Sequence, residues 1–169
     1  MSEGSIYTVR RAPADFVPQA DWDSEEWRGV PEARITCFPW DENGHRPDVA
    51  ARLQYTPDYV YVIFRVQDRY VRSVETRTNG RVCADACVEF FFSPAPGRCP
   101  DYFNIETNCG GVALFAVQEA RGVNPRSIAP EDVAQLQVAH SMPAVVDPEV
   151  EGPLTWVNAW RIPLELVER

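Results

Sequence analysis

The sequence predicts an all-β protein, a single antiparallel β-sandwich of the jelly-roll type. Fifteen prolines and nine glycines interrupt the 169 residues at short intervals, and apolar runs of strand length fill the gaps. Helical periodicity is scarce. Hydrophobic residues make up 45% of the chain, which is enough to build a core at this length without a metal ion or a disulfide. We expect a lead segment over residues 1–20 and one domain over residues 21–169.

Seven segments combine β-branched and aromatic residues in strand-like runs between turn residues. They are Ala51–Thr56, Tyr59–Gln67, Ala86–Phe92, Tyr102–Asn108, Val112–Gln118, Val133–Ser141 and Thr155–Ile162. Pro57 and Asp58 form a tight turn between the first two segments, and Gly110 and Gly111 supply a short hairpin turn between two later ones. We therefore expect both of these strand pairs to be antiparallel.

Two further features concern the ends of elements. Pro130, followed by two acidic residues, suits the first position of a short helical turn. The sequence Ile162-Pro163-Leu164 predicts that the last strand ends there and that another begins.

Charge and composition exclude several classes of protein. A net charge of −9 argues against a nucleic-acid partner, because phosphate binding depends on basic side chains. No run approaches the roughly 20 apolar residues of a membrane span, and Met1–Arg11 lacks the apolar segment of a secretory signal. We expect a cytoplasmic location for the chain as it stands, or an extracellular or periplasmic one if its native start lies upstream. Its five cysteines are expected to be reduced.

Alternation along the predicted strands places a set of polar side chains on one face, opposite apolar core residues. Amides, carboxylates and a guanidinium group beside aromatic rings suit a sugar, whose hydroxyls take directed hydrogen bonds while its C–H faces stack on rings. The polar set is Arg65, Glu89, Asn104, Glu106 and Asn108.

Four stretches are similar, in order and spacing, to family 9-like carbohydrate-binding modules, which belong to the DOMON-like β-sandwiches. They are ARLQYTPDYVYVIFRVQDRYVRS, DACVEFFFSP, YFNIETNCGG and TWVNAWRIPLELV. The resemblance implies a non-catalytic β-sandwich of bacterial type that holds a mono-, di- or oligosaccharide between aromatic side chains. It also implies an association with glycoside hydrolases as catalytic partners in carbohydrate catabolism. Such modules usually continue beyond the last stretch, so an edge strand is expected to be missing where this chain stops at Arg169.

Aromatic and metal-binding candidates complete the predicted site. The aromatic platform is expected from Trp156 or Trp160, with Trp40 or Tyr70 near the rim. The resemblance allows calcium ions that buttress loops, and the candidate ligands, each in a turn or at a strand end, are Asp41, Asn43 and Asp85.

Three alternative functions remain open at this point. Glu89 and Glu106 could be the paired carboxylates of a glycoside hydrolase. The tryptophan-rich face could instead bind another polypeptide. A haem-binding sandwich would need ligands on opposite sides of the haem, and His140 and Met142 lie two residues apart on one strand, which disfavours that function.

Overall fold

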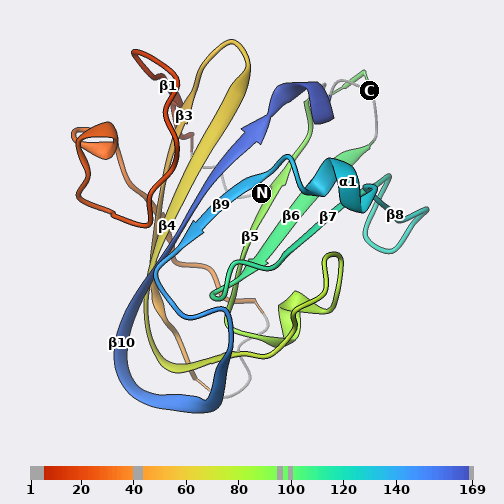
Figure 1. The fold of residues 1–169 in the computed structure, drawn as a ribbon. Coiled ribbons are helices and arrows are strands. Elements are labelled where there is room, and N and C mark those ends of the chain that lie inside the picture. The colour runs from red at the N-terminus through yellow and green to blue at the C-terminus, as the bar shows by residue number, and fades with distance from the viewer. Residues whose placement is uncertain (1–5, 40–43, 95–96, 99–100, 168–169) are drawn as a thin grey trace.

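The computed structural model describes residues 6–39, 44–94, 97–98 and 101–167, and the chain folds into two β-sheets that pack face to face (Figure 1). The larger sheet has the order β1-β3-β4-β10-β9, with β2 paired to β3. Its strands are β1 (Arg10–Arg11), β2 (Ala33–Ile35), β3 (Asp48–Tyr55), β4 (Tyr59–Ser73), β9 (Gln137–His140) and β10 (Val146–Pro163). The smaller sheet has the order β5-β6-β7-β8. Its strands are β5 (Cys87–Phe92), β6 (Tyr102–Asn108), β7 (Ala113–Gln118) and β8 (Arg126–Ser127).

Among the residues that the structure describes, helical structure is limited to short turns. They are the 3₁₀ turns η1 (Glu25–Trp27), η2 (Val82–Ala84) and η3 (Leu164–Leu166), and the helix α1 (Pro130–Val133), which begins with proline as predicted. No helix among the described residues is long and apolar enough to cross a membrane.

The predicted antiparallel pairs β3–β4 and β6–β7 are confirmed. Strand β10 begins well before the predicted Thr155, because it pairs with the long β4 back to Ser73. The prediction of a new strand after Pro163 is wrong, since the 3₁₀ turn η3 follows. Strands β1, β2 and β8 have only two or three residues each and were not predicted, because such short segments show no alternation.

The main core lies between the two sheets and contains the inward-facing side chains of both. Ile105 of β6 and Phe115 of β7 are fully buried there, as is Trp160 of β10. The ring of Trp160 lies 5.0 Å from that of Phe64 on the neighbouring strand β4. Buried residues of both sheets form one cluster, which holds the smaller sheet on the inner face of the larger one.

A second apolar cluster covers the opposite, outer face of the larger sheet. The segment before β2 contributes Trp22 and Trp27, which pack with Tyr61 and Ile63 of β4. Phe16, which belongs to the predicted lead segment, stacks on Tyr61 with ring centres 4.0 Å apart. The larger sheet is therefore buried on both faces over its centre. This second cluster does not cover the outer face of the smaller sheet.

The core position of Trp160 predicts that its truncation is costly. We expect Trp160→Ala to lower the free energy of unfolding by about 3–5 kcal/mol, because it leaves a large cavity between the sheets. Tyr70→Ala is the control, since 43% of the Tyr70 surface is exposed. Urea unfolding followed by circular dichroism measures both variants, and a loss below about 1 kcal/mol for Trp160→Ala would contradict this packing.

Candidate functional site

The outer face of the smaller sheet brings together polar side chains from β5, β6 and β7. In the β5–β6 register Glu89 lies opposite Glu106, and Phe91 lies opposite Asn104. In the β6–β7 register Tyr102 lies opposite Gln118. The residues between them, such as Val88 and Ile105, point into the core. We call the set Cys87, Glu89, Phe91, Tyr102, Asn104, Glu106 and Gln118 the open face.

Two neighbouring carboxyl groups form the centre of the open face. Burial raises the pKa of Glu89 above its ordinary value, and the nearby carboxylate of Glu106 raises it further. Burial also raises the pKa of Glu106, although a hydrogen bond from Asn104 Nδ2 to Glu106 Oε1, 2.9 Å long, partly opposes that shift. Neither carboxyl group has an ion pair with a basic side chain among the residues that the structure describes.

Aromatic rings lie directly beside these carboxyl groups. Phe91 is 49% exposed, and its ring centre lies 6.0 Å from that of Tyr102. Phe91 alternates with Glu89 along β5 and so shares its face, yet the predicted aromatic platform, drawn from three tryptophans and Tyr70, did not include it. The open face thus combines a stacking surface with hydrogen-bond acceptors.

Arg65 does not join this set, and its predicted place beside Glu89 is wrong. It belongs to β4 of the other sheet, where its guanidinium group lies 4.6 Å from the centre of the Trp22 ring. Its Nη2 atom is 3.9 Å from Glu32 Oε2. Alternation correctly assigned Arg65 to an outward face, but that face belongs to the larger sheet.

Trp156 and Trp160 also require correction as platform residues. Their exposed fractions are 1% and 0%, because their common face points into the core between the sheets. A sugar cannot stack on either ring in this structure. Trp40 lies outside the described residues.

Tyr70 is exposed, but it lies in a separate cleft. That cleft has a volume of about 1160 Å³ and is lined by residues of the β3, β4 and β10 region, including His45, Asp68 and Thr155. The ring of His45 lies 5.2 Å from that of Tyr70, and its Nε2 atom lies 2.8 Å from Asp68 Oδ1. No residue of β5 or β6 lines this cleft, so Tyr70 is not part of the open face.

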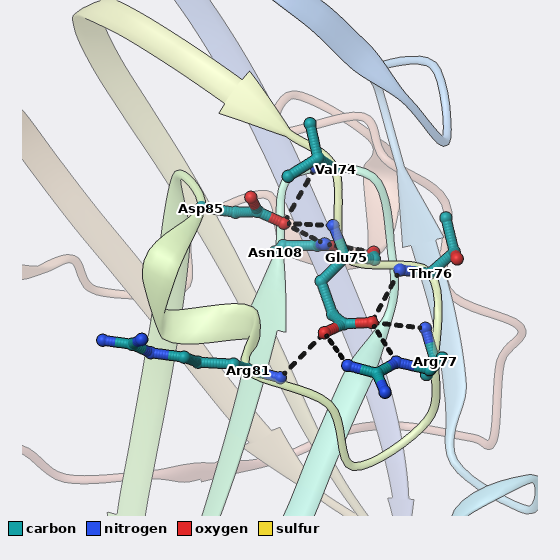
Figure 2. A network of polar contacts seen from close by, with 7 residues as sticks. All are labelled: Val74, Glu75, Thr76, Arg77, Arg81, Asp85 and Asn108. Atoms are coloured by element: carbon teal, nitrogen blue, oxygen red, sulfur yellow. Dashed lines mark hydrogen bonds and ion pairs between the residues drawn. The ribbon is translucent and has the colours of Figure 1, made fainter.

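Asn108 lies on the same strand as Glu106 but is completely buried by the loop between β4 and β5. Its Nδ2 donates to Asp85 Oδ2 at 2.9 Å, and the same oxygen accepts backbone hydrogen bonds from Val74 and Glu75 at 3.0 and 2.9 Å (Figure 2). Asn108 Oδ1 accepts from the backbone N–H of Val112 at 2.9 Å. Asn108 and Asp85 therefore hold this loop on the sheet.

Glu75 organises the rest of the loop in the same manner. Its carboxylate accepts backbone hydrogen bonds from Thr76, Arg77 and Arg81 at 3.0 to 3.1 Å, and the Arg77 side chain forms two further bonds at 3.0 Å (Figure 2). These hydrogen bonds, those from Arg77 above all, lower the pKa of Glu75 from 4.5 to about 2. The loop is thus built around two carboxylates that are surrounded by N–H donors.

Among the described residues of this loop, the buried Oδ1 of Asp85 is a carboxylate oxygen without a hydrogen-bond partner, and the other carboxylate oxygens of Asp85 and Glu75 already accept N–H groups. Calcium needs six to eight oxygen ligands. Asp85 Oδ2 already accepts three N–H groups, and Asn108 turns its NH₂ group, not its oxygen, toward Asp85. The guanidinium group of Arg77 supplies the positive charge at Glu75. The other calcium candidates, Asp41 and Asn43, lie outside the described residues.

Comparison with known proteins identifies related sequences and folds. The sequence model of carbohydrate-binding family 9 matches residues 25–167. One similar fold is the crystal structure of a protein from Bacteroides uniformis to which a carbohydrate-binding role is attributed. Its sequence is 25% identical to this chain and its TM-score is 0.83, and the match covers 95% of this chain and 73% of that one. A second is a family 9 module from Caldicellulosiruptor kristjanssonii in complex with glucose. Its sequence is 13% identical to this chain and its TM-score is 0.50, and the match covers 92% of this chain and 68% of that one. No curated protein matches.

The low pKa of Glu75 predicts a specific pH dependence of stability. Because its folded pKa of about 2 lies below its ordinary value of 4.5, the ionised group stabilises the fold above pH 4.5. That contribution is lost as the pH falls from about 4.5 to about 2. We expect Glu75→Gln to lower the melting temperature at pH 6 and to differ less and less from the unmodified protein as the pH approaches 2. Glu149→Gln, at an exposed position of β10, is the control. A difference that stays constant between pH 6 and pH 2 would contradict this role.

Proposed function

The chain belongs to carbohydrate-binding family 9, and from that premise we propose that the open face of β5, β6 and β7 is its sugar-binding surface. The observation that supports this proposal is an exposed aromatic ring beside two carboxyl groups with unused acceptor atoms. Phe91 is 49% exposed, and the buried Oε2 of Glu106 and Oδ1 of Asn104 have no hydrogen-bond partner among the described residues. Glu89 is exposed and has no ion pair with a basic side chain among the described residues, so its carboxylate can accept hydrogen bonds from sugar hydroxyls.

In this proposal the sugar lies flat against the sheet. One ring stacks its C–H face on Phe91, with Tyr102 alongside. Hydroxyl groups donate to Glu89 and Glu106, and a carboxylate accepts stronger hydrogen bonds than a neutral oxygen does. Asn104 positions Glu106 through the hydrogen bond that its Nδ2 donates to Glu106 Oε1.

The arrangement of the carboxyl groups supports binding rather than hydrolysis. In a glycoside hydrolase the two carboxyl groups flank the scissile bond from different sides. Glu89 and Glu106 are instead cross-strand neighbours on one surface, and each offers an oxygen within 4.8 Å of the other's. They would approach a sugar from the same side.

The dimensions of the open face favour a short saccharide. Neighbouring strands lie about 4.8 Å apart, so the three strands span about 10 Å. This width suits a mono- or disaccharide, or the end of an oligosaccharide. A module that only binds sugar would serve a catalytic partner protein, such as a glycoside hydrolase, by holding it at its substrate.

Removal of the aromatic ring tests the stacking surface. A panel of glucose, galactose, mannose, cellobiose and xylobiose, titrated by calorimetry, first identifies the sugar that binds. We expect Phe91→Ala to lower the affinity for that sugar by about 5- to 150-fold. This equals about 1–3 kcal/mol of binding free energy, by analogy with aromatic stacking on nucleobases. Tyr70→Ala is the matched control, with 43% exposure in the other cleft, and should bind normally. Normal binding by Phe91→Ala with weaker binding by Tyr70→Ala would instead place the site in the Tyr70 cleft. If no sugar of the panel binds, a protein-interaction surface is favoured.

Removal of one charge separates a binding module from an enzyme. We expect Glu106→Gln to keep the fold and to weaken sugar binding by about 10-fold or more, because a charged hydrogen bond contributes about 1.5–3 kcal/mol. A glycoside hydrolase would instead lose turnover while it kept much of its affinity. Turnover is measured as the release of reducing ends from oligosaccharides. If the unmodified protein shows turnover, and Glu106→Gln loses it but still binds the sugar, the proposed role of Glu106 in binding is overturned.

A further inference from the structure

Three potential metal ligands meet at the centre of the open face. The Sγ atom of Cys87 and one carboxylate oxygen each of Glu89 and Glu106 all lie within 4.8 Å of one another. Their positions follow from the sheet, since Glu89 and Glu106 are cross-strand partners and Cys87 precedes Glu89 by two residues on the same face of β5. Sugar binding by hydrogen bonds and stacking makes no use of the thiol.

A buried amide at the same place points to a missing ligand. Asn104 is only 4% exposed, and its Nδ2 donates to Glu106 Oε1 at 2.9 Å, so the amide group lies against the cluster. Its Oδ1 has no partner among the described residues, and neither has the buried Oε2 of Glu106. The two carboxyl groups have no basic partner among the described residues, and Glu106 keeps one buried oxygen unpaired, so a bound cation would balance their charge.

We propose that Cys87, Glu89 and Glu106 bind a divalent transition-metal ion such as Zn²⁺. The sulfur ligand decides the kind of ion, because Ca²⁺ and Mg²⁺ take oxygen ligands, whereas Zn²⁺ and Co²⁺ accept sulfur and oxygen together. Ligand atoms of tetrahedral zinc lie roughly 3.5 Å apart. The side chains need to close in only slightly from their present positions, and Glu89 is exposed enough to rotate. The Cys87 proton passes to solvent when the metal binds.

The metal site also deepens the proposed function, on which this second part rests. Three protein ligands leave one position of a tetrahedral zinc ion open, and a sugar hydroxyl can take that position. The ion would then hold the sugar at the centre of the open face, next to Phe91. Zinc should therefore strengthen sugar binding.

Cobalt provides a direct test of the metal site. The protein is reduced, stripped with a chelator and titrated with Co²⁺, and the near-ultraviolet absorption of a thiolate–Co²⁺ bond is recorded. We expect this band to saturate at a single ion per chain, to be lost in Cys87→Ser, and to be bleached by Zn²⁺. Cys37→Ser is the matched control, since Cys37 is exposed and lies outside the cluster, and it should keep the band. Glu106→Gln should lower the affinity for Co²⁺ by at least about 10-fold. Absence of the band, or its persistence in Cys87→Ser, would overturn the metal site.

Sugar titrations of the stripped and the zinc-loaded protein separate this inference from the proposed function. We expect the sugar selected from the panel to bind at least about 5-fold more tightly to the zinc-loaded form, and Cys87→Ser to lose this gain. Equal affinity in both forms would overturn the role of the ion in sugar binding. A cobalt band without sugar binding to either form would uphold the metal site while it refuted the sugar-binding function.

Discussion

The packing of Phe16, Trp22 and Trp27 over β4 determines which surface of this protein can bind a ligand. These side chains close the outer face of the larger sheet, and the smaller sheet closes its inner face. Antiparallel sheets of a sandwich often keep one face open to solvent. Here that face belongs to β5, β6 and β7, and the polar residues of these strands can therefore stay accessible without cost to the core.

The electrostatic environment divides the carboxylates into two kinds. Glu75 is surrounded by N–H donors, which favour its ionised form, and Asp85 Oδ2 accepts backbone N–H groups that help to fix the loop between β4 and β5 (Figure 2). Glu89 and Glu106 have each other as neighbours, and burial raises the pKa of both. A pair of carboxyl groups that the fold itself does not stabilise is expected where an external donor or cation completes the arrangement. The contrast separates residues that build the structure from residues that face a ligand.

Strand-like apolar runs between turn residues predicted the sandwich and the two hairpins, and alternation predicted the outward direction of Glu89, Asn104 and Glu106. It failed where the outcome depends on which sheet a strand joins and what covers it. Arg65 points outward, but from the other sheet and under Trp22. Trp156 and Trp160 share a face, and that face is the core because the smaller sheet packs on it. Such long-range pairings leave no local signal, whereas Phe91 could have been recognised from its alternation with Glu89 alone.

The central claim is that sugar binds on β5, β6 and β7. The most direct measurement is the change in backbone amide chemical shifts on titration of ¹⁵N-labelled protein with the sugar that binds most tightly. We predict that the largest shifts map to Glu89, Phe91, Asn104 and Glu106, with small changes at His45 and Tyr70. Shifts concentrated in the Tyr70 cleft, with the open face unchanged, would contradict the account.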